Sequence, residues 1–294
     1  MIGEAAARAL PPEMPAFFRD AVAQLGYLNP EPDRWRAPRE HALDPAMDAA
    51  YAPEHYVDME LLPPHALDAP DRFAYDDSLR AAGTSADAVG LLPYRIYELT
   101  ARLREEFRLW RAAPNAQVRE WVEARIVDDA GILGHYVADA ANPHHTTIHH
   151  HGWVGENPRG YSTDRSIHSR FESAYVQTHI RPDDFASLVA PRPRTMVPLR
   201  DSVRAYLDRS AAQLGRLYDL EKAEPFGPDT RGEQHRRFVA ERLAAGATAL
   251  RDVWWTAWVT SADSAQRPAK SEQGNTPGRA TAGRPDGVPR SADR

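Results

Sequence analysis

Residues 134–153 read GHYVADAANPHHTTIHHHGW, and they contain the end of a long helical pattern. Apolar residues recur at helical spacing from residue 116 to residue 141, and Asn142-Pro143 then ends the pattern, because proline disfavours helical backbone in the residue before it. Comparable spacing recurs over residues 91–110, 166–180, 196–221 and 233–260, between stretches that contain proline and glycine. The sequence therefore predicts an all-α fold.

The remaining sequence indicates how the chain is organised around these helices. Residues 26–90 carry many prolines and short polar turns, without strand alternation, so we expect long irregular loops there. Residues 261–294 contain no aromatic residue and are rich in Ser, Ala, Gly, Pro and Arg, which is typical of disorder. We therefore predict one multi-helix domain over residues 1–260 and a disordered C-terminal tail over residues 261–294.

Composition excludes several classes of protein. The 294 residues are 42% hydrophobic and 27% charged, which is ordinary for a globular chain, and the net charge of −6 provides no overall basic field for nucleic acid or anionic lipid. No apolar run approaches the roughly 18 residues of a transmembrane helix. The absence of cysteine leaves His, Asp and Glu as the ligands for any transition metal.

Histidines cluster where such a metal site is expected. Six of the twelve lie between residues 135 and 151. His135 and Asp139 are four residues apart on a predicted helix, which places both side chains on one face, and His145 follows just after the helix ends. His168 and Glu172 repeat the same spacing on another predicted helix. Two such pairs indicate a multinuclear site, and nitrogen and oxygen ligands without sulfur favour a catalytic zinc that retains water.

This pattern resembles a known superfamily. His135-Tyr-x-x-Asp139, followed by Asn-Pro and then by His145, resembles the core motif of the zinc-dependent phospholipase C / S1-P1 nuclease superfamily. The later pair of His168 and Glu172 resembles the next ligand pair of that superfamily, which is His-x-x-x-Glu in the phospholipases and His-x-x-x-Asp in the nucleases.

Two upstream segments extend the resemblance. Residues 52–58, APEHYVD, resemble the short segment in which a histidine precedes an aromatic residue and an aspartate, so His55 is the matching ligand. Residues 32–36, PDRWR, resemble an Ala-Asp-x-x-Arg turn, which makes Asp33 the matching first-metal carboxylate. Asp44 and Asp48 compete for that role.

The resemblance implies an all-α fold around a zinc centre and a phosphodiester substrate. A hydroxide that bridges the metals would be the nucleophile, and Asp33 would orient or deprotonate it. One zinc ion would be held by Asp33, His55, His135 and Asp139, and a second by His145, His168 and Glu172.

The resemblance also implies a third zinc site, completed by a mature N-terminal tryptophan and a nearby histidine that this chain does not contain. Residues 1–10, MIGEAAARAL, resemble the helix that begins just after that histidine. We expect two zinc ions in this chain, and three if residues upstream of Met1 exist. The location would then be secreted or periplasmic if the start is internal, and cytoplasmic if Met1 is the true start.

Two substrate classes and one rival function stay open. Glu172 favours a phospholipase C acting on a phospholipid, the His145-to-His168 spacing favours a nuclease acting on single-stranded nucleic acid, and we place the phospholipase slightly ahead. The rival is a non-catalytic metal-binding or interaction protein that retains the fold with an incomplete third site.

The sequence indicates no obligate protein partner and no transmembrane segment. We interpret the run His149–His151 as a polar loop, and Trp254 and Trp258 as core residues.

Overall fold

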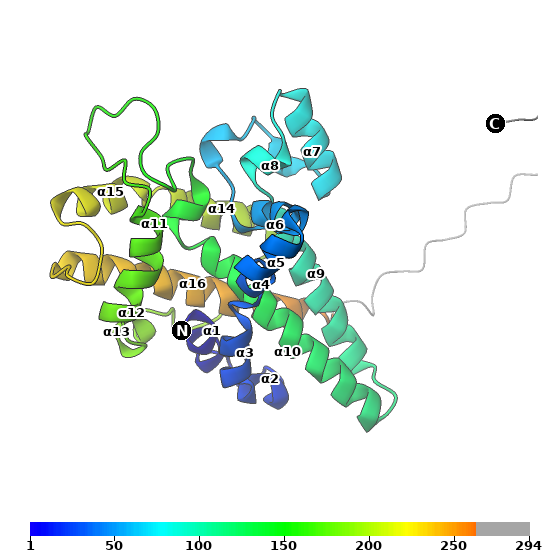
Figure 1. Ribbon diagram of the computed structural model, residues 1–294. Coiled ribbons are helices and arrows are strands. Elements are labelled where there is room, and N and C mark those ends of the chain that lie inside the picture. Colours follow the sequence, from blue (N-terminus) through cyan, green and yellow to red (C-terminus); the bar gives the residue numbers. More distant parts are fainter. Residues whose placement is uncertain (263–294) are drawn as a thin grey trace, which may run out of the picture. The chain divides into compact units, whose positions relative to one another are not determined.

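The computed structural model describes residues 1–262, and within them every regular element is helical (Figure 1). The elements are α1 (Ile2–Arg8), α2 (Ala16–Asp20), α3 (Val22–Leu28), α4 (Glu31–Trp35), α5 (Pro38–Leu43), α6 (Pro45–Tyr51), η1 (Ala52–His55), η2 (Met59–Leu61), η3 (Ala66–Asp68), α7 (Arg72–Ala81), α8 (Ala86–Val89), α9 (Leu92–Arg111), α10 (Ala116–Asp139), η4 (Pro143–Thr146), α11 (Ile167–Ser169), η5 (Arg170–Tyr175), α12 (Val176–His179), α13 (Asp183–Ala186), α14 (Leu199–Ala211), α15 (Leu214–Ala223) and α16 (Glu233–Thr260). The all-α prediction is confirmed. The predicted tail lies outside the described residues except for Ser261 and Ala262.

The long helices follow the predicted pattern, with one exception. Helices α9, α10 and α16 match the expected segments to within about two residues, and α11, η5 and α12 together form the segment expected over residues 166–180. The single segment expected over residues 196–221 is wrong, because α14 ends at Ala211 and α15 begins at Leu214.

Residues 26–90 are mostly short helices, so the expectation of long irregular loops there is wrong. Pro32, Pro38, Pro45 and Pro53 each lie in the first turn of a short helix, in α4, α5, α6 and η1 respectively. Proline fits that position because the first-turn N–H groups have no partner inside the helix. Segments without helix lie elsewhere, over residues 147–166 and 187–198.

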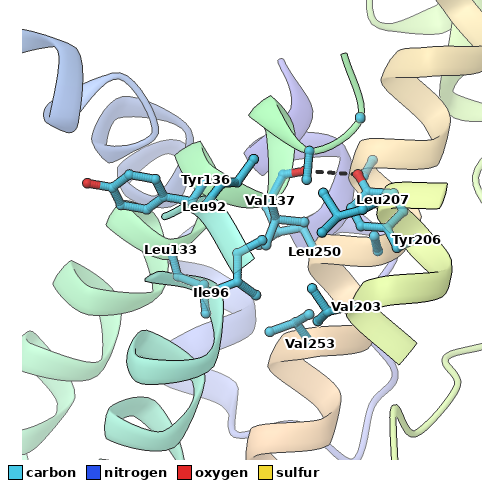
Figure 2. Packing of buried hydrophobic residues seen from close by; sticks show 14 of the residues in the cluster. Leu92, Ile96, Leu133, Tyr136, Val137, Val203, Tyr206, Leu207, Leu250 and Val253 are labelled. Atoms are coloured by element: carbon cyan, nitrogen blue, oxygen red, sulfur yellow. Dashed lines mark hydrogen bonds between the residues drawn. The ribbon is translucent and has the colours of Figure 1, made fainter. Parts of the chain in front are cut away.

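The end of α10 is held in the centre of the core. Figure 2 shows the apolar side chains that surround it, namely Leu92 and Ile96 of α9, Leu133 and Val137 of α10, Val203 and Leu207 of α14, and Leu250 and Val253 of α16. The Tyr206 hydroxyl of α14 donates a hydrogen bond of 2.9 Å to the Val137 carbonyl. The last two turns of α10, which carry His135 and Asp139, therefore project from a rigid support.

The tryptophans of α16 pack as the sequence predicts. Trp254 is fully buried, and its ring meets Phe18 edge-on with centroids 5.3 Å apart. Its indole N–H donates a hydrogen bond of 3.1 Å to the Ala130 carbonyl of α10. Trp258 packs against Phe107, with ring centroids 5.4 Å apart. These contacts join α16 to α9 and α10, and they explain why three long helices share one core.

A buried pair of carboxylates lies between α9 and α10, with Asp129 less than two helical turns before His135. Glu106 is 1% exposed and Asp129 is 5% exposed. Arg125 donates a hydrogen bond of 3.3 Å to Glu106, and the Nε of Arg102 is 2.5 Å from Asp129 Oδ2. Burial, and after it the neighbouring Asp129, raises the pKa of Glu106 to about 7. The folded chain therefore holds a proton on this carboxyl that the unfolded chain releases at a lower pH.

Glu106→Gln is expected to change how stability depends on pH. Because the folded pKa of Glu106 lies above its unfolded value, its contribution to stability is present at low pH and is lost as the pH rises toward 7. The variant lacks this loss, so its free energy of unfolding minus that of the parent should be larger at pH 8 than at pH 5, by about 2 kcal/mol. Urea denaturation at both pH values measures the difference.

Glu105→Gln is the matched control, because Glu105 lies on the same helix with its side chain 56% exposed. Its relative stability should change by less than about 0.5 kcal/mol between the two pH values. Equal behaviour of the two variants would contradict the account of the buried pair.

Candidate metal centre

Three elements bring the first group of predicted ligands together. Asp33 lies in α4, His55 ends η1, and His135 and Asp139 lie in the last two turns of α10. His135 Nε2 is 2.9 Å from His55 Nδ1 and 3.2 Å from Asp139 Oδ2. His55 Nδ1 is 3.1 Å from Asp139 Oδ2. Asp33 Oδ1 lies 3.7 Å from His135 Nε2, at the edge of the group.

A second group forms from the segments that follow α10. His145 lies in η4, His168 in α11, and Glu172 in η5, which is a π-helical stretch. The Nε2 atoms of His145 and His168 are 3.2 Å apart, and Glu172 Oε2 lies 3.2 Å from the first and 3.0 Å from the second. Stretches of π-helix inside helices occur frequently at functional sites. Here the stretch carries one of the ligand candidates.

Asp139 joins the two groups. Its Oδ2 lies within 3.2 Å of His135 in the first group, while its Oδ1 lies 3.9 Å from His145 Nε2 in the second. The side chain is 11% exposed, so it is held between the groups with little contact to solvent. One carboxylate therefore faces both candidate sites.

The spacing of the ligand atoms fits a metal ion. In a tetrahedral zinc site with bonds of about 2.1 Å, neighbouring ligand atoms are about 3.4 Å apart. Within each group, the imidazole nitrogens and the Asp139 or Glu172 oxygen lie 2.9 to 3.2 Å from one another, slightly closer than that, while Asp33 Oδ1 lies farther out, 3.7 Å from His135 Nε2. A dication at the middle of each group could contact all of these nitrogen and oxygen atoms once the imidazoles are neutral. The residues present fit zinc.

Backbone and amide contacts fix the orientation of the second group. His145 Nδ1 donates to the His55 carbonyl at 2.7 Å, because a carbonyl oxygen can only accept, and this contact directs Nε2 toward Glu172 Oε2, 3.2 Å away. The Val57 N–H donates to the His145 carbonyl at 2.9 Å. Asn142 Nδ2 donates to Glu172 Oε2 at 2.9 Å. The sequence indicated Asn142 only as a helix end, and its role as a support for Glu172 was missed.

Glu54 is a second residue that sequence reasoning missed. It is 6% exposed, and it accepts hydrogen bonds of 3.3 Å from the Tyr136 hydroxyl and 3.0 Å from Arg72. The Nε of Arg95 lies 3.2 Å from Glu54 Oε2. These contacts fasten η1 to α9 and α10, and so they position His55. The only signal in the sequence was that Glu54 directly precedes a candidate ligand.

Among the competing aspartates, the structure brings Asp33 to the group. Asp44 caps α6 by accepting a hydrogen bond of 3.1 Å from the Ala46 N–H. Asp48 pairs with Arg36 at 2.8 Å. Both carboxylates thus have other partners, whereas Asp33 has its side chain 62% exposed beside His135.

Asp139 and Glu172 are ionised at neutral pH. Burial alone would raise the pKa of Asp139, but the charges of His135 and His145 outweigh it and hold that pKa well below its ordinary value. Desolvation would likewise raise the pKa of Glu172, yet hydrogen bonds from His145 and His168 keep it low. Desolvation disfavours charge on His145, and Asp139 and Glu172 nevertheless raise its pKa to about 9. Bound zinc would take the place of these imidazole protons and would stay paired with the ionised carboxylates.

The other histidines of the cluster stay outside these two groups. His149 stacks on Trp153 with ring centroids 3.8 Å apart and planes 7° apart, in the helix-free segment over residues 147–166. His144 stacks on His168, with centroids 5.0 Å apart. Within residues 1–262, the groups of closely facing ligand atoms are Asp33, His55 and His135, and His145, His168 and Glu172.

A cavity of about 230 Å³ opens beside the centre. Asp33, His135, Asp139 and Glu172 line it together with apolar residues. It reaches both groups, so a small part of a substrate can approach the ligand atoms from this side.

None of the helices over residues 1–262 combines the length and apolar character that crossing a membrane requires. No family model, curated protein or solved structure matches this chain.

Proposed function

We propose that this protein is a zinc-dependent phosphodiester hydrolase of the phospholipase C / S1-P1 nuclease type. One observation carries the proposal: residues from six elements, in a sequence pattern that resembles the motifs of that superfamily, converge into two adjoining groups that share Asp139. Structural zinc sites are usually closed and rich in cysteine, whereas this centre has only nitrogen and oxygen donors beside an open cavity. That combination favours catalysis.

Zinc bound at this centre supplies Lewis acidity, which neutralises charge on the phosphoryl oxygens and makes water a nucleophile near neutral pH. The residues of the chain then have separable tasks. Asp139 faces one group with each of its two carboxylate oxygens, and it thereby fixes the position of the two groups relative to each other. Asp33 lines the cavity with its carboxylate 62% exposed, so it can accept a proton from a water molecule that attacks from the open side.

The surrounding structure keeps these groups in place. Asn142 and the His55 carbonyl fix Glu172 and His145, and the rigid end of α10 fixes His135. Catalytic groups placed within a fraction of an ångström by such supports lose little entropy in the reaction. The proposal therefore rests on the supports as well as on the ligand candidates.

The test is hydrolysis by the zinc-loaded chain of bis(p-nitrophenyl) phosphate, phosphatidylcholine and single-stranded oligonucleotides. We expect turnover of at least one of them, its loss on treatment with EDTA and its return when zinc is restored. Full zinc loading without hydrolysis of any phosphodiester would overturn the proposal and favour a non-catalytic metal-binding protein.

A further inference from the structure

A second, larger cavity shares one lining residue with the cavity beside the metal centre. Its volume is about 640 Å³, and it lies between α14, α16 and residues 188–196. Three arginines line it, namely Arg194, Arg209 and Arg242. Arg242 also lines the cavity beside the metal centre, together with Asp139 and Glu172. This side chain therefore borders both cavities.

The charge of the larger cavity is positive. Its acidic lining residues, Glu241 and Asp252, are already paired with arginines that lie outside the cavity. Glu241 pairs with Arg216 at 2.7 Å and with Arg237 at 3.0 Å, and Asp252 pairs with Arg251 at 2.6 Å.

The lining arginines have no such partner in the part of the chain that the structure describes. No carboxylate there lies within 4.0 Å of the guanidinium nitrogens of Arg194, Arg209 or Arg242. Their charges therefore remain available to an anion from outside the chain.

One nitrogen of the Arg242 guanidinium is also buried without a partner in the described part of the chain. Its Nε is buried and makes no hydrogen bond among the described residues. Burying an unpaired charged donor is unfavourable, and an anion that accepts from it would offset the penalty. A guanidinium group matches phosphate well because its N–H donors form a planar fork.

The chemistry of these cavities disfavours a choline headgroup. Quaternary ammonium groups are recognised by several aromatic rings that surround the cation. Phe171 is the single aromatic residue that lines the cavity beside the metal centre within the described chain, and Arg242 lies in the same lining. Arginine would repel a cationic headgroup. A strand of nucleic acid instead carries a further phosphate one nucleotide from any internal scissile phosphate.

We propose that Arg194, Arg209 and Arg242 bind a second phosphate of the substrate, next to the scissile phosphate at the metal centre, and that the substrate is single-stranded nucleic acid. The inference rests on the proposed function only in placing the scissile phosphate at the centre. Arg242 binds closest to the metal centre, since it lines both cavities. Arg194 and Arg209 extend the contact away from it.

Equilibrium binding tests this inference without any need for turnover. The probe is a short fluorescein-labelled oligothymidylate with phosphorothioate linkages, which keep the charge and resist cleavage, and the readout is fluorescence anisotropy with the zinc-loaded chain. Arg242→Gln and Arg209→Gln should each weaken binding about tenfold. Each should also reduce the slope of log affinity against log salt by about 0.7.

Arg119→Gln is the control that removes the same charge. Arg119 is exposed on α10, about 24 Å along the helix from His135, and it lines neither cavity. The affinity of the Arg119→Gln variant for the probe should match that of the parent. Cavity variants that bind like the parent, or that lose no more affinity than Arg119→Gln, would overturn the inference.

Competition distinguishes the source of the phosphate. Unlabelled oligothymidylate should displace the probe, while inorganic phosphate at the same phosphate concentration should displace it far less. Equal displacement by inorganic phosphate would reduce the cavity to a site for free anions and overturn the assignment to nucleic acid. Preferential displacement by vesicles containing a polyphosphoinositide would overturn it in favour of an anionic lipid.

The two proposals can fail separately. A chain that binds the probe through its arginines but hydrolyses no phosphodiester would contradict the proposed function and leave the arginine site standing. A hydrolase whose oligonucleotide binding ignores these arginines would contradict only the further inference.

Discussion

Asp139→Asn is expected to reduce phosphodiester hydrolysis by about a thousandfold or more, while the fold is retained. Asp139 is the side chain that faces both ligand groups, with Oδ2 near His135 and Oδ1 near His145. Asparagine keeps the shape of the side chain, but it removes the negative charge and one of the two acceptor oxygens. Both candidate metal sites are weakened by this one change, so the loss should exceed that of any variant confined to one group.

The measurement is the initial rate on bis(p-nitrophenyl) phosphate, with circular dichroism to verify the helical fold. Asp128→Asn is the matched control, because Asp128 is exposed on the same helix, eleven residues earlier. Its rate should stay within about twofold of the parent. A rate for Asp139→Asn within about tenfold of the parent would show that this carboxylate does not organise the centre.

Zinc is expected to stabilise the folded chain strongly. The ligand candidates lie on α4, η1, α10, η4 and the α11–η5 segment, so bound metal would fasten together parts of the chain far apart in sequence. Free zinc at a thousand times the dissociation constant adds about 4 kcal/mol for each site that only the folded state forms. For a chain of this length, two sites should raise the melting temperature by about 15 °C or more above that of the EDTA-treated protein.

Single substitutions show how much of the rise in melting temperature each of the two metal sites provides. His145→Ala should remove roughly half of the shift, because it takes one imidazole from the second group and leaves the first group intact. His65→Ala is the control, since the His65 side chain is 86% exposed and pairs with Asp68 at 2.9 Å outside the centre. Identical melting of the zinc-loaded and EDTA-treated chains would contradict the two-site account.

The pattern of residues in the sequence is sufficient to predict those features of the structure that depend on spacing within one helix. The apolar period of α10 predicts the helix, and the four-residue spacing of His135 and Asp139 places both side chains on its inner end. The same reasoning holds for His168 and Glu172, which face His145 in the structure. Because the spacing of residues within a helix fixes which side chains share a face, these predictions agree with the structure.

Local pattern was insufficient where structure depends on contacts between segments. The prolines over residues 26–90 predict loops, although Pro32 and Pro38 occupy helix first turns in the structure. Asn142 and Arg242 matter because of what folding brings beside them, Glu172 in one case and two cavities in the other. No spacing rule in a single sequence reports such neighbours. Zinc, activity, substrate and location stay predictions.

The zinc-to-protein ratio of the purified chain tests the central claim most directly. Elemental mass spectrometry after dialysis against a weak chelator measures it. We expect two zinc ions per chain, and about one for His168→Ala, because that change removes an imidazole from the second group alone. A chain that retains no zinc, or whose zinc content is unchanged in both Asp139→Asn and His168→Ala, would contradict the assignment of these residues as a metal centre.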